Sequence, residues 1–137
     1  MFFKDKNAKK VYKKAFNCVG GGDYDEAISY FMEIYENYCN ESNFIYAIAY
    51  SYFMIKDWNN SLKYSNELIN LDHDNEDAIN IKAGCLVHLE KFEEALECIN
   101  QFISNHNPSP ELLKNKKEIE IMNNIHSKGK IKLNIIS

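Results

Sequence analysis

The residues of this chain that could bind a metal or carry redox chemistry are its four cysteines and four histidines. Zinc and redox centres need closely spaced ligands, as in a C-x-x-C pair or an H-E-x-x-H helix. The sequence contains neither spacing. We therefore expect reduced, mostly buried thiols, surface histidines, no metal site and no cofactor. The eight residues are Cys18, Cys39, Cys85, Cys98, His73, His88, His106 and His126.

Two further stretches contain residue types found in catalytic sites. The stretch "EKFEEALE" at 90–97 offers paired carboxylates, but their helical spacing is typical of a solvated helix face. The stretch "GGG" at 20–22 lacks the Lys-Ser/Thr pair and the preceding strand of a phosphate loop, and it indicates the end of a helix and a turn. Since no nucleophile with a base and no cofactor loop is found, we predict that the protein is not an enzyme.

The composition, 45% hydrophobic and 26% charged, is ordinary for a globular domain. No apolar run is long enough for a membrane-spanning helix, and the first residues carry charges where a signal peptide needs an apolar stretch. We therefore expect a cytoplasmic protein without a membrane partner.

Charge is distributed unevenly along the chain. Residues 4–14 carry six lysines against one acid, whereas residues 23–97 carry sixteen acids against four lysines. Arginine, the usual residue for recognising guanine and phosphate, is absent from the sequence. Because nucleic-acid binding requires a continuous basic surface, this distribution predicts that the chain has no nucleic-acid partner.

A pattern of large and small residues repeats with a period of 34 residues. In each unit two helical patterns are separated by a turn, as in residues 45–52, "KDWNN" and residues 62–69. Small residues recur where two antiparallel helices would cross most closely. Such a short hairpin cannot bury its own apolar face, so successive units must stack. The columns in register are Val11/Ile45/Ile79, Ala15/Ala49/Ala83, Cys18/Tyr52/Leu86, Tyr24/Trp58/Phe92 and Ala27/Ser61/Ala95.

With "GDYDEAISYF" at 22–31, this pattern resembles the tetratricopeptide repeat (TPR). The resemblance implies an all-α fold, a right-handed α-solenoid in which residues 1–137 form a single domain. The repeats would be residues 8–41, 42–75 and 76–109. The second repeat departs from the pattern by carrying Ser61 where Ala is usual and Ser65 where a larger residue is common.

A seventh long helix is expected to cap the third repeat. Ser109 is a suitable N-cap and Pro110 a suitable first helical residue, which predicts a capping helix over residues 110–127. We expect Leu112, Leu113, Ile119 and Met122 to cover the third repeat, because a solenoid needs a polar outer end. Residues 128–137 form a tail, for which a short strand and a frayed end are both open.

The resemblance also implies that the first helix of each repeat lines a concave groove that binds another protein, as an extended or helical peptide. Tyrosine offers a large contact area with a polar tip, so an aromatic groove suits apolar anchors of a partner. The expected groove residues are Tyr12, Phe16, Tyr46, Tyr50, Phe53, Met54, Asn80, Val87 and His88.

The two-carboxylate clamp by which some members of the family hold chaperone C-termini is not expected. The corresponding positions carry Tyr12, Phe16, Ala47, Asp77 and Ile81 in place of Lys, Asn and Arg. The predicted function is thus a noncatalytic protein-interaction module or scaffold. Two alternatives stay open: the chain's own C-terminal tail fills the groove, or the groove or end cap is buried in a homodimer.

Overall fold

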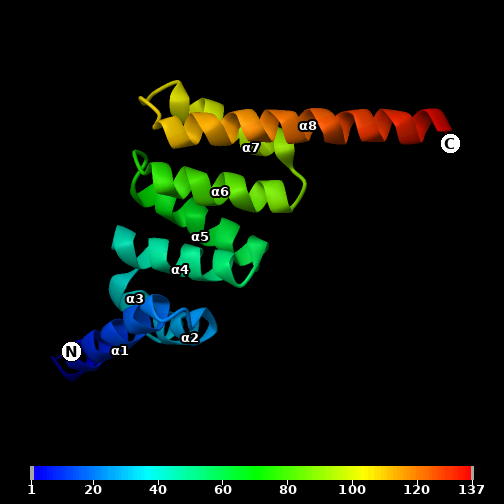
Figure 1. Ribbon diagram of the computed structural model, residues 1–137. Helices are drawn as coiled ribbons and strands as arrows, with labels where there is room; N and C mark the ends of the chain where they lie inside the picture. The colour runs from blue at the N-terminus through cyan, green and yellow to red at the C-terminus, as the bar shows by residue number, and fades with distance from the viewer. Residues whose placement is uncertain (1, 137) are drawn as a thin grey trace.

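The computed structural model describes residues 2–136, and the side chains of residues 6–129. The described residues form helices joined by short turns (Figure 1). The helices are α1 (Phe2–Gly20), α2 (Tyr24–Glu33), α3 (Tyr35–Tyr38), α4 (Ser42–Met54), α5 (Trp58–Leu71), α6 (Glu76–His88), α7 (Phe92–Ile103) and α8 (Pro110–Ile136).

Three helix hairpins stack in chain order, and α8 closes the stack (Figure 1). Within the hairpins α1 packs on α2, α4 on α5 and α6 on α7, and successive hairpins meet through α2 with α4 and α5 with α6. The predicted all-α helical-repeat fold is confirmed. Helix α1 begins upstream of the first expected repeat, and a break at Ile34 separates α2 from the short α3.

The hairpin turns repeat the 34-residue period in their backbone geometry. Gly22, Lys56 and Glu90 have φ angles of 80°, 64° and 60°. In each turn the amide that follows the positive-φ residue donates to a carbonyl five residues earlier, as from Asp23 to Cys18 at 2.8 Å. This pattern satisfies the carbonyls at the end of the first helix. Glycine adopts such a φ without steric cost, whereas Lys56 and Glu90 adopt it with strain.

The predicted small residues lie where the paired helices cross. Ala49 and Ser61 are fully buried in the second hairpin, and the equivalent alanines of the other two are buried as well. The Ser61 hydroxyl donates to the carbonyl oxygen of Ala49 at 2.8 Å. Ser65 donates in the same way to the carbonyl of Leu62 at 2.9 Å. Both serines of the second repeat are therefore buried with their hydroxyls satisfied, which avoids the penalty of an unpaired polar group.

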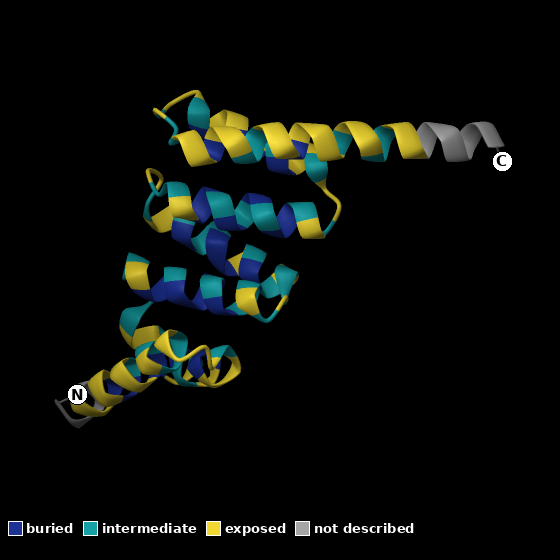
Figure 2. Cartoon of the chain, in the orientation of Figure 1, coloured by how far each residue is buried: buried dark blue, intermediate teal, exposed yellow. Residues whose placement is uncertain are grey.

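Buried residues are concentrated where the helices pack against one another, while α1 and α8 each have a long exposed side (Figure 2). One core cluster joins the first two hairpins to α6 around Phe31 and Phe44, and a second joins α6, α7 and α8 around Ile99 and Leu112. The stacking thus provides the apolar core that no single hairpin could form.

Helix α8 begins as predicted. Ser109 is its N-cap, because the Ser109 hydroxyl accepts a hydrogen bond from the amide of Leu112 at 3.1 Å. The same hydroxyl donates to Glu76 Oε2 at 2.6 Å, and the Ser109 amide donates to Glu76 Oε1 at 2.8 Å. These bonds tie the start of α8 to the start of α6.

Two expectations for α8 are wrong. Leu112 and Ile119 are buried, but Leu113 and Met122 are 43% and 37% exposed and do not cover the third repeat. A helix turns about 100° per residue, so Leu113 leaves the face that Leu112 shares with Ile119.

The second correction concerns residues 128–137. Helix α8 continues to Ile136, so the capping helix does not end at residue 127, and neither the strand nor the frayed end is found. The alternating segment 130–135 could form a stable strand only by pairing with other strands, and the described residues contain none. Gly129 costs a helix only about 1 kcal/mol. Ser137 lies outside the described residues.

Candidate partner-binding groove

The first helices of the first two repeats enclose a hollow of about 450 Å³, here named the aromatic trough. Tyr12, Phe16 and Val19 of α1 form one wall, and Asn43, Tyr46, Ala47 and Tyr50 of α4 form the other. Each wall follows the i, i+3, i+4 spacing that places side chains on one helix face. The trough therefore contains four of the predicted groove residues, all aromatic.

The aromatic rings of the trough are held by contacts with one another. The ring centroids of Tyr46 and Tyr50 are 6.0 Å apart at an interplanar angle of 17°, and those of Tyr12 and Phe16 are 4.7 Å apart. Tyr24, from the start of α2, packs edge-on against Tyr50 at 5.8 Å. Such pairs restrict the rings to few orientations, so the walls are largely preorganised.

The hydroxyls of Tyr12 and Tyr46 are neutral hydrogen-bonding groups. The Tyr12 hydroxyl donates to Glu41 Oε1. Burial and this bond raise the pKa of Tyr12 to about 12. The pKa of Tyr46 is also raised, first by burial and then by the charge of Asp77. Both phenols therefore stay protonated at neutral pH. Tyr46 can donate its proton to a partner, whereas the Tyr12 proton is already donated to Glu41 and its oxygen can only accept.

The lining of the trough contains no lysine and no histidine. Ala47 belongs to the lining, while Ile81 of α6 is buried in the core. Among the lining residues there is therefore no positive charge to form an ion pair with the carboxylates of an acidic peptide. The chemistry of the trough therefore favours apolar and aromatic side chains over anions.

Phe53 lies outside the trough, in a separate aromatic cluster. Its ring centroid is 5.0 Å from that of Trp58 and 6.0 Å from that of His88, and the Trp58 and His88 rings stack at 3.9 Å. A Cβ added at Gly84 would lie 2.9 Å from Phe53 Cε2. Phe53 thus fixes α4 against α6, where only glycine leaves room for its ring. Met54, the next residue, is exposed.

The remaining predicted residues, Asn80, Val87 and His88, line a smaller hollow of about 210 Å³ between α6 and α8. The side-chain amide of Asn115 on α8 donates to Asn80 Oδ1 at 3.2 Å. At this end of the inner face, which is formed by α1, α4 and α6, α8 occupies part of the surface that the repeat pattern assigns to a partner. The sequence did not indicate this coverage, because the position of α8 depends on the bonds of Ser109 to Glu76.

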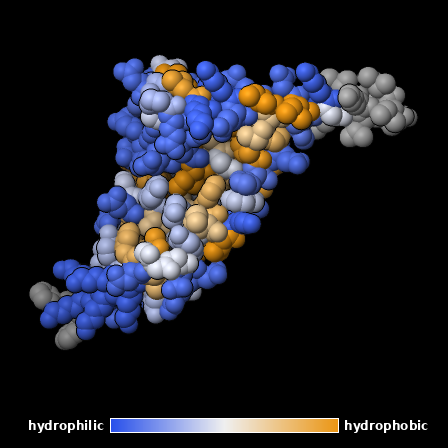
Figure 3. All heavy atoms as spheres, viewed as in Figure 1, coloured by the Kyte–Doolittle hydropathy of each residue, from blue (hydrophilic) through white to orange (hydrophobic). Residues whose placement is uncertain are grey.

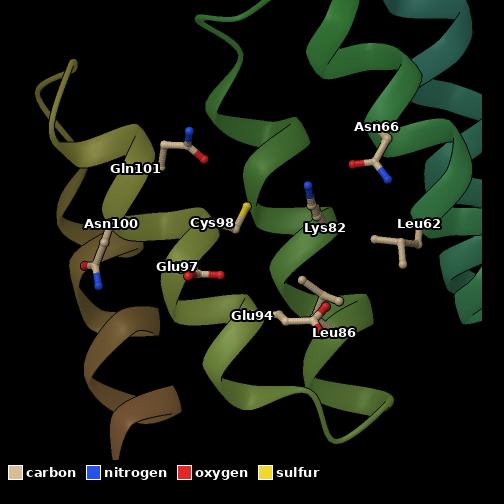
Figure 4. Close-up of a pocket in the computed structure, with 9 residues that line it drawn as sticks. All are labelled: Leu62, Asn66, Lys82, Leu86, Glu94, Glu97, Cys98, Asn100 and Gln101. Atoms are coloured by element: carbon tan, nitrogen blue, oxygen red, sulfur yellow. The ribbon is translucent and has the colours of Figure 1, made fainter.

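A larger hollow of about 930 Å³ lies between α5, α6 and α7 (Figure 4). Carboxamides and carboxylates make up most of its lining, which includes Asn66, Lys82, Glu94, Glu97 and Gln101. The carboxylates belong to the exposed face of α7, in agreement with the sequence. Because this hollow has no aromatic wall, it offers few apolar anchor positions.

Viewed from the side of α1, α4 and α6, the middle of the molecule has intermediate and hydrophobic surface, drawn pale and orange, between hydrophilic surface over α1 and over the start of α8 (Figure 3).

No described helix is both long and apolar enough to cross a bilayer.

Stacked helix hairpins with a 34-residue period define a helical-repeat protein of the tetratricopeptide type. The family model of anaphase-promoting complex, cyclosome, subunit 3 (ANAPC3), which is of this type, matches residues 20–102, more than half of the chain. The chain therefore belongs to this tetratricopeptide-repeat family. No curated protein matches the sequence.

Several solved structures share the fold. The second TPR domain of human RPAP3, in complex with HSP70 peptide SGPTIEEVD, is 15% identical with a TM-score of 0.74, over 85% of this chain and 98% of that one. The Yersinia enterocolitica type III secretion chaperone SycD, in complex with a peptide of the translocator YopD, is 16% identical with a TM-score of 0.70, over 91% and 95%. Yeast Tom70 is 21% identical with a TM-score of 0.78, over 94% of this chain and 26% of Tom70.

Proposed function

We propose that the chain is a noncatalytic protein-interaction module, and that an apolar segment of a partner protein binds in the aromatic trough. The observation that carries this proposal is the hollow of about 450 Å³ whose walls bear four aromatic rings. No described part of the chain fills it, and α8 lies at the other end of the stack (Figure 1). A preformed apolar hollow with few polar groups is the usual form of a recognition site.

Binding would combine apolar anchoring with hydrogen bonds at the rim. A partner side chain that buries about 100 Å² of apolar surface gains about 2.5 kcal/mol before the cost of ordering the segment. The phenol of Tyr46 and the amide of Asn43 can donate to backbone carbonyls of the segment, and the Tyr12 oxygen, whose proton goes to Glu41, can accept from a backbone amide. Rings on both walls would thus select the anchors, and the polar tips would orient the chain that carries them.

Two similar structures lend support, because the RPAP3 domain and SycD were each solved with a peptide. We further propose that a longer segment continues over the concave face towards Met54 and His88, both of which are exposed. There it would pass Phe53, Asn80 and Val87. The division into repeats 8–41, 42–75 and 76–109 and a cytoplasmic location are part of the same proposal.

The test starts from peptides selected on the wild-type protein from a displayed random library. The affinity of the best peptide is measured by fluorescence polarisation for wild type and for a Tyr46→Ala/Tyr50→Ala variant. Removing a central aromatic anchor costs about 2 kcal/mol or more, so we expect at least about a thirtyfold loss of affinity. Circular dichroism should show nearly unchanged helix content, because both rings are only half-buried.

A matched control is Glu97→Ala in the larger polar hollow, which should leave the affinity within about twofold because an exposed charge contributes little. The proposal fails if the folded double tyrosine variant binds as tightly as wild type. It also fails if Glu97→Ala weakens binding as much, because the peptide would then occupy the other side of the molecule.

Self-association is the alternative function. Through the groove it would require a second copy to enter the trough, and the same tyrosine variant would then change the oligomeric state. Through the end cap it would rest on a different observation, the exposed apolar side chains of α8.

A further inference from the structure

Helix α8 has apolar residues on two sides. Leu112 and Ile119 are buried against the body of the protein. Ile121, Met122 and Ile125 are 60%, 37% and 66% exposed. At about 100° per residue these three lie within about 100° of one another, roughly 120° from the buried side. They form a second apolar face, here named the α8 stripe.

The α8 stripe lies where the helix leaves the body. The His126 ring is 5.1 Å from that of Phe92 at the start of α7, and beyond Ser127 both Lys128 and Gly129 are exposed. Figure 1 shows α8 running past the other helices at its C-terminal end. Figure 3 shows apolar surface on the same stretch of the helix. A helix that is apolar on two sides is usually buried on two sides, and the fold covers only one of them.

The charges that flank the stripe select the occupant. Glu118 precedes the stripe by one turn and Lys128 follows it by one turn, and both side chains are exposed. Neither forms an ion pair among the described residues. A second α8 in parallel orientation would bring Glu118 next to Glu118 and Lys128 next to Lys128. In antiparallel orientation each Glu118 meets the Lys128 of the other copy, and the stripes coincide.

We propose that the α8 stripe is a homodimer interface, in which the α8 helices of two copies pair antiparallel about a two-fold axis near Met122 and Ile125. Such an interface is self-complementary, since one patch supplies both halves. Two helices in contact over about three turns bury less than a standard interface, so the dimer should be reversible, with a Kd on the order of micromolar. The aromatic trough stays open in this dimer.

The experiment is sedimentation equilibrium of the full chain from about 1 µM to about 300 µM, a range that brackets this Kd. We expect a monomer–dimer equilibrium for wild type. Ile125→Lys should raise the dimer Kd at least about tenfold while circular dichroism stays unchanged, because a charge would be buried in the contact. The matched control is Leu113→Lys, an exposed apolar residue of α8 about 130° from the stripe, which should leave the Kd unchanged.

A charge exchange tests the orientation. Glu118→Lys and Lys128→Glu should each weaken the dimer by about twofold to fivefold, and the double variant should restore it. The proposal is overturned if wild type is monomeric over the whole range, if Ile125→Lys still dimerises, or if the double exchange is no better than either single change. A dimer lost in Tyr46→Ala/Tyr50→Ala but kept in Ile125→Lys would also overturn it, since the contact would then lie in the trough.

Discussion

The two ends of the inner face are built on the same repeat positions, yet the end between α1 and α4 is open and the end at α6 is closed by α8. At the first inner position the three repeats carry Tyr12, Tyr46 and Asn80, and four residues later they carry Phe16, Tyr50 and Gly84. The first two repeats thus place aromatic rings where the third places an amide and a glycine.

The exchange of ring for amide and glycine changes what each end can bind. Gly84 has no side chain and so leaves room for the Phe53 ring, and Asn80 accepts a hydrogen bond from Asn115 of α8. The inner side of the third repeat is therefore packed by side chains from other helices of the same protein. No described side chain fills the aromatic trough. In this protein the repeat fixes the positions of inner side chains, while residue type decides between a binding surface and a packing surface.

The closed end should lose the most stability when its cover is loosened. Leu112→Ala removes a fully buried side chain between α8 and the third repeat, and we expect it to lower the free energy of unfolding by about 2–5 kcal/mol. Leu113→Ala, the neighbouring change on the exposed side, should cost less than about 1 kcal/mol. Urea unfolding followed by circular dichroism measures both. Equal effects would show that α8 does not close this end.

A smaller loss is expected when Gly84 is filled. Gly84→Leu places side-chain atoms where the Phe53 ring lies, and overpacking of this kind costs about 1–3 kcal/mol. The double variant Gly84→Leu/Phe53→Ala should regain part of that stability, because it removes the clashing ring. If the double variant is only the sum of two losses, Phe53 and Gly84 do not share one space.

The hairpin turns of the first and third repeats have a positive φ at equivalent positions, Gly22 and Glu90, so substitutions there test whether the two turns have the same backbone geometry. Gly22→Ala should cost about 1–2 kcal/mol from backbone strain alone, because no atom lies within 4 Å of the added Cβ. Glu90→Gly, at the equivalent turn of the third repeat, should stabilise the protein by less than about 1 kcal/mol, since glycine relieves the strain but loses more entropy on folding. Thermal unfolding gives both signs. If both substitutions destabilise the protein, or both stabilise it, the two turns do not have equivalent backbone strain.

The smallest effect is a pH dependence confined to the closed end. His106 Nδ1 lies 3.0 Å from the carbonyl oxygen of Phe102, and Nε2 lies 2.6 Å from Asp74 Oδ1. Both partners accept, so the protonated imidazole, in which both ring nitrogens donate, is the form that satisfies both contacts. The bond to Asp74, followed by that to Phe102, raises the pKa of His106 above its ordinary 6.5.

A histidine whose pKa is raised on folding contributes stability that is fully present below its unfolded pKa and is lost as pH rises through its folded pKa. We therefore expect the melting temperature to fall slightly between pH 6 and pH 8 for this reason. His106→Asn should reduce that slope, and Tyr12→Phe should not, because the pKa of Tyr12 is about 12. An unchanged slope in His106→Asn would assign the pH dependence to other groups.

Much of the fold could be predicted because the repeat constrains it at many positions at once. The small residue at each helix crossing and the 34-residue step indicate the hairpins without any tertiary information. The positive φ of Lys56 and Glu90 carries no signal of its own, since neither is glycine, although both lie one period from a glycine turn. The length of α8 was not predictable in the same way, because residues 130–135 alternate polar and apolar side chains, a pattern typical of a strand, although they continue the helix.

The site was only partly predictable for a physical reason. Spacing assigns Tyr12, Tyr46 and Phe53 to the inner side of their helices, but it does not say which of them meets another part of the chain. That depends on Gly84, and on an α8 whose direction is set by the Ser109–Glu76 bonds. Tertiary contacts, not helix register, therefore separate Phe53 from the trough.

The most direct measurement of the central claim is amide hydrogen exchange of the full chain with and without the peptide selected on it. If the partner binds at the open end, the peptide should slow exchange most in residues 12–19 and 43–50, less or not at all in residues 80–88, and should leave residues 94–101 unchanged. Protection confined to residues 80–88, beside α8, would contradict the assignment of binding to the open end. Protection of residues 94–101 would place the peptide in the polar hollow and contradict the aromatic trough as the binding site.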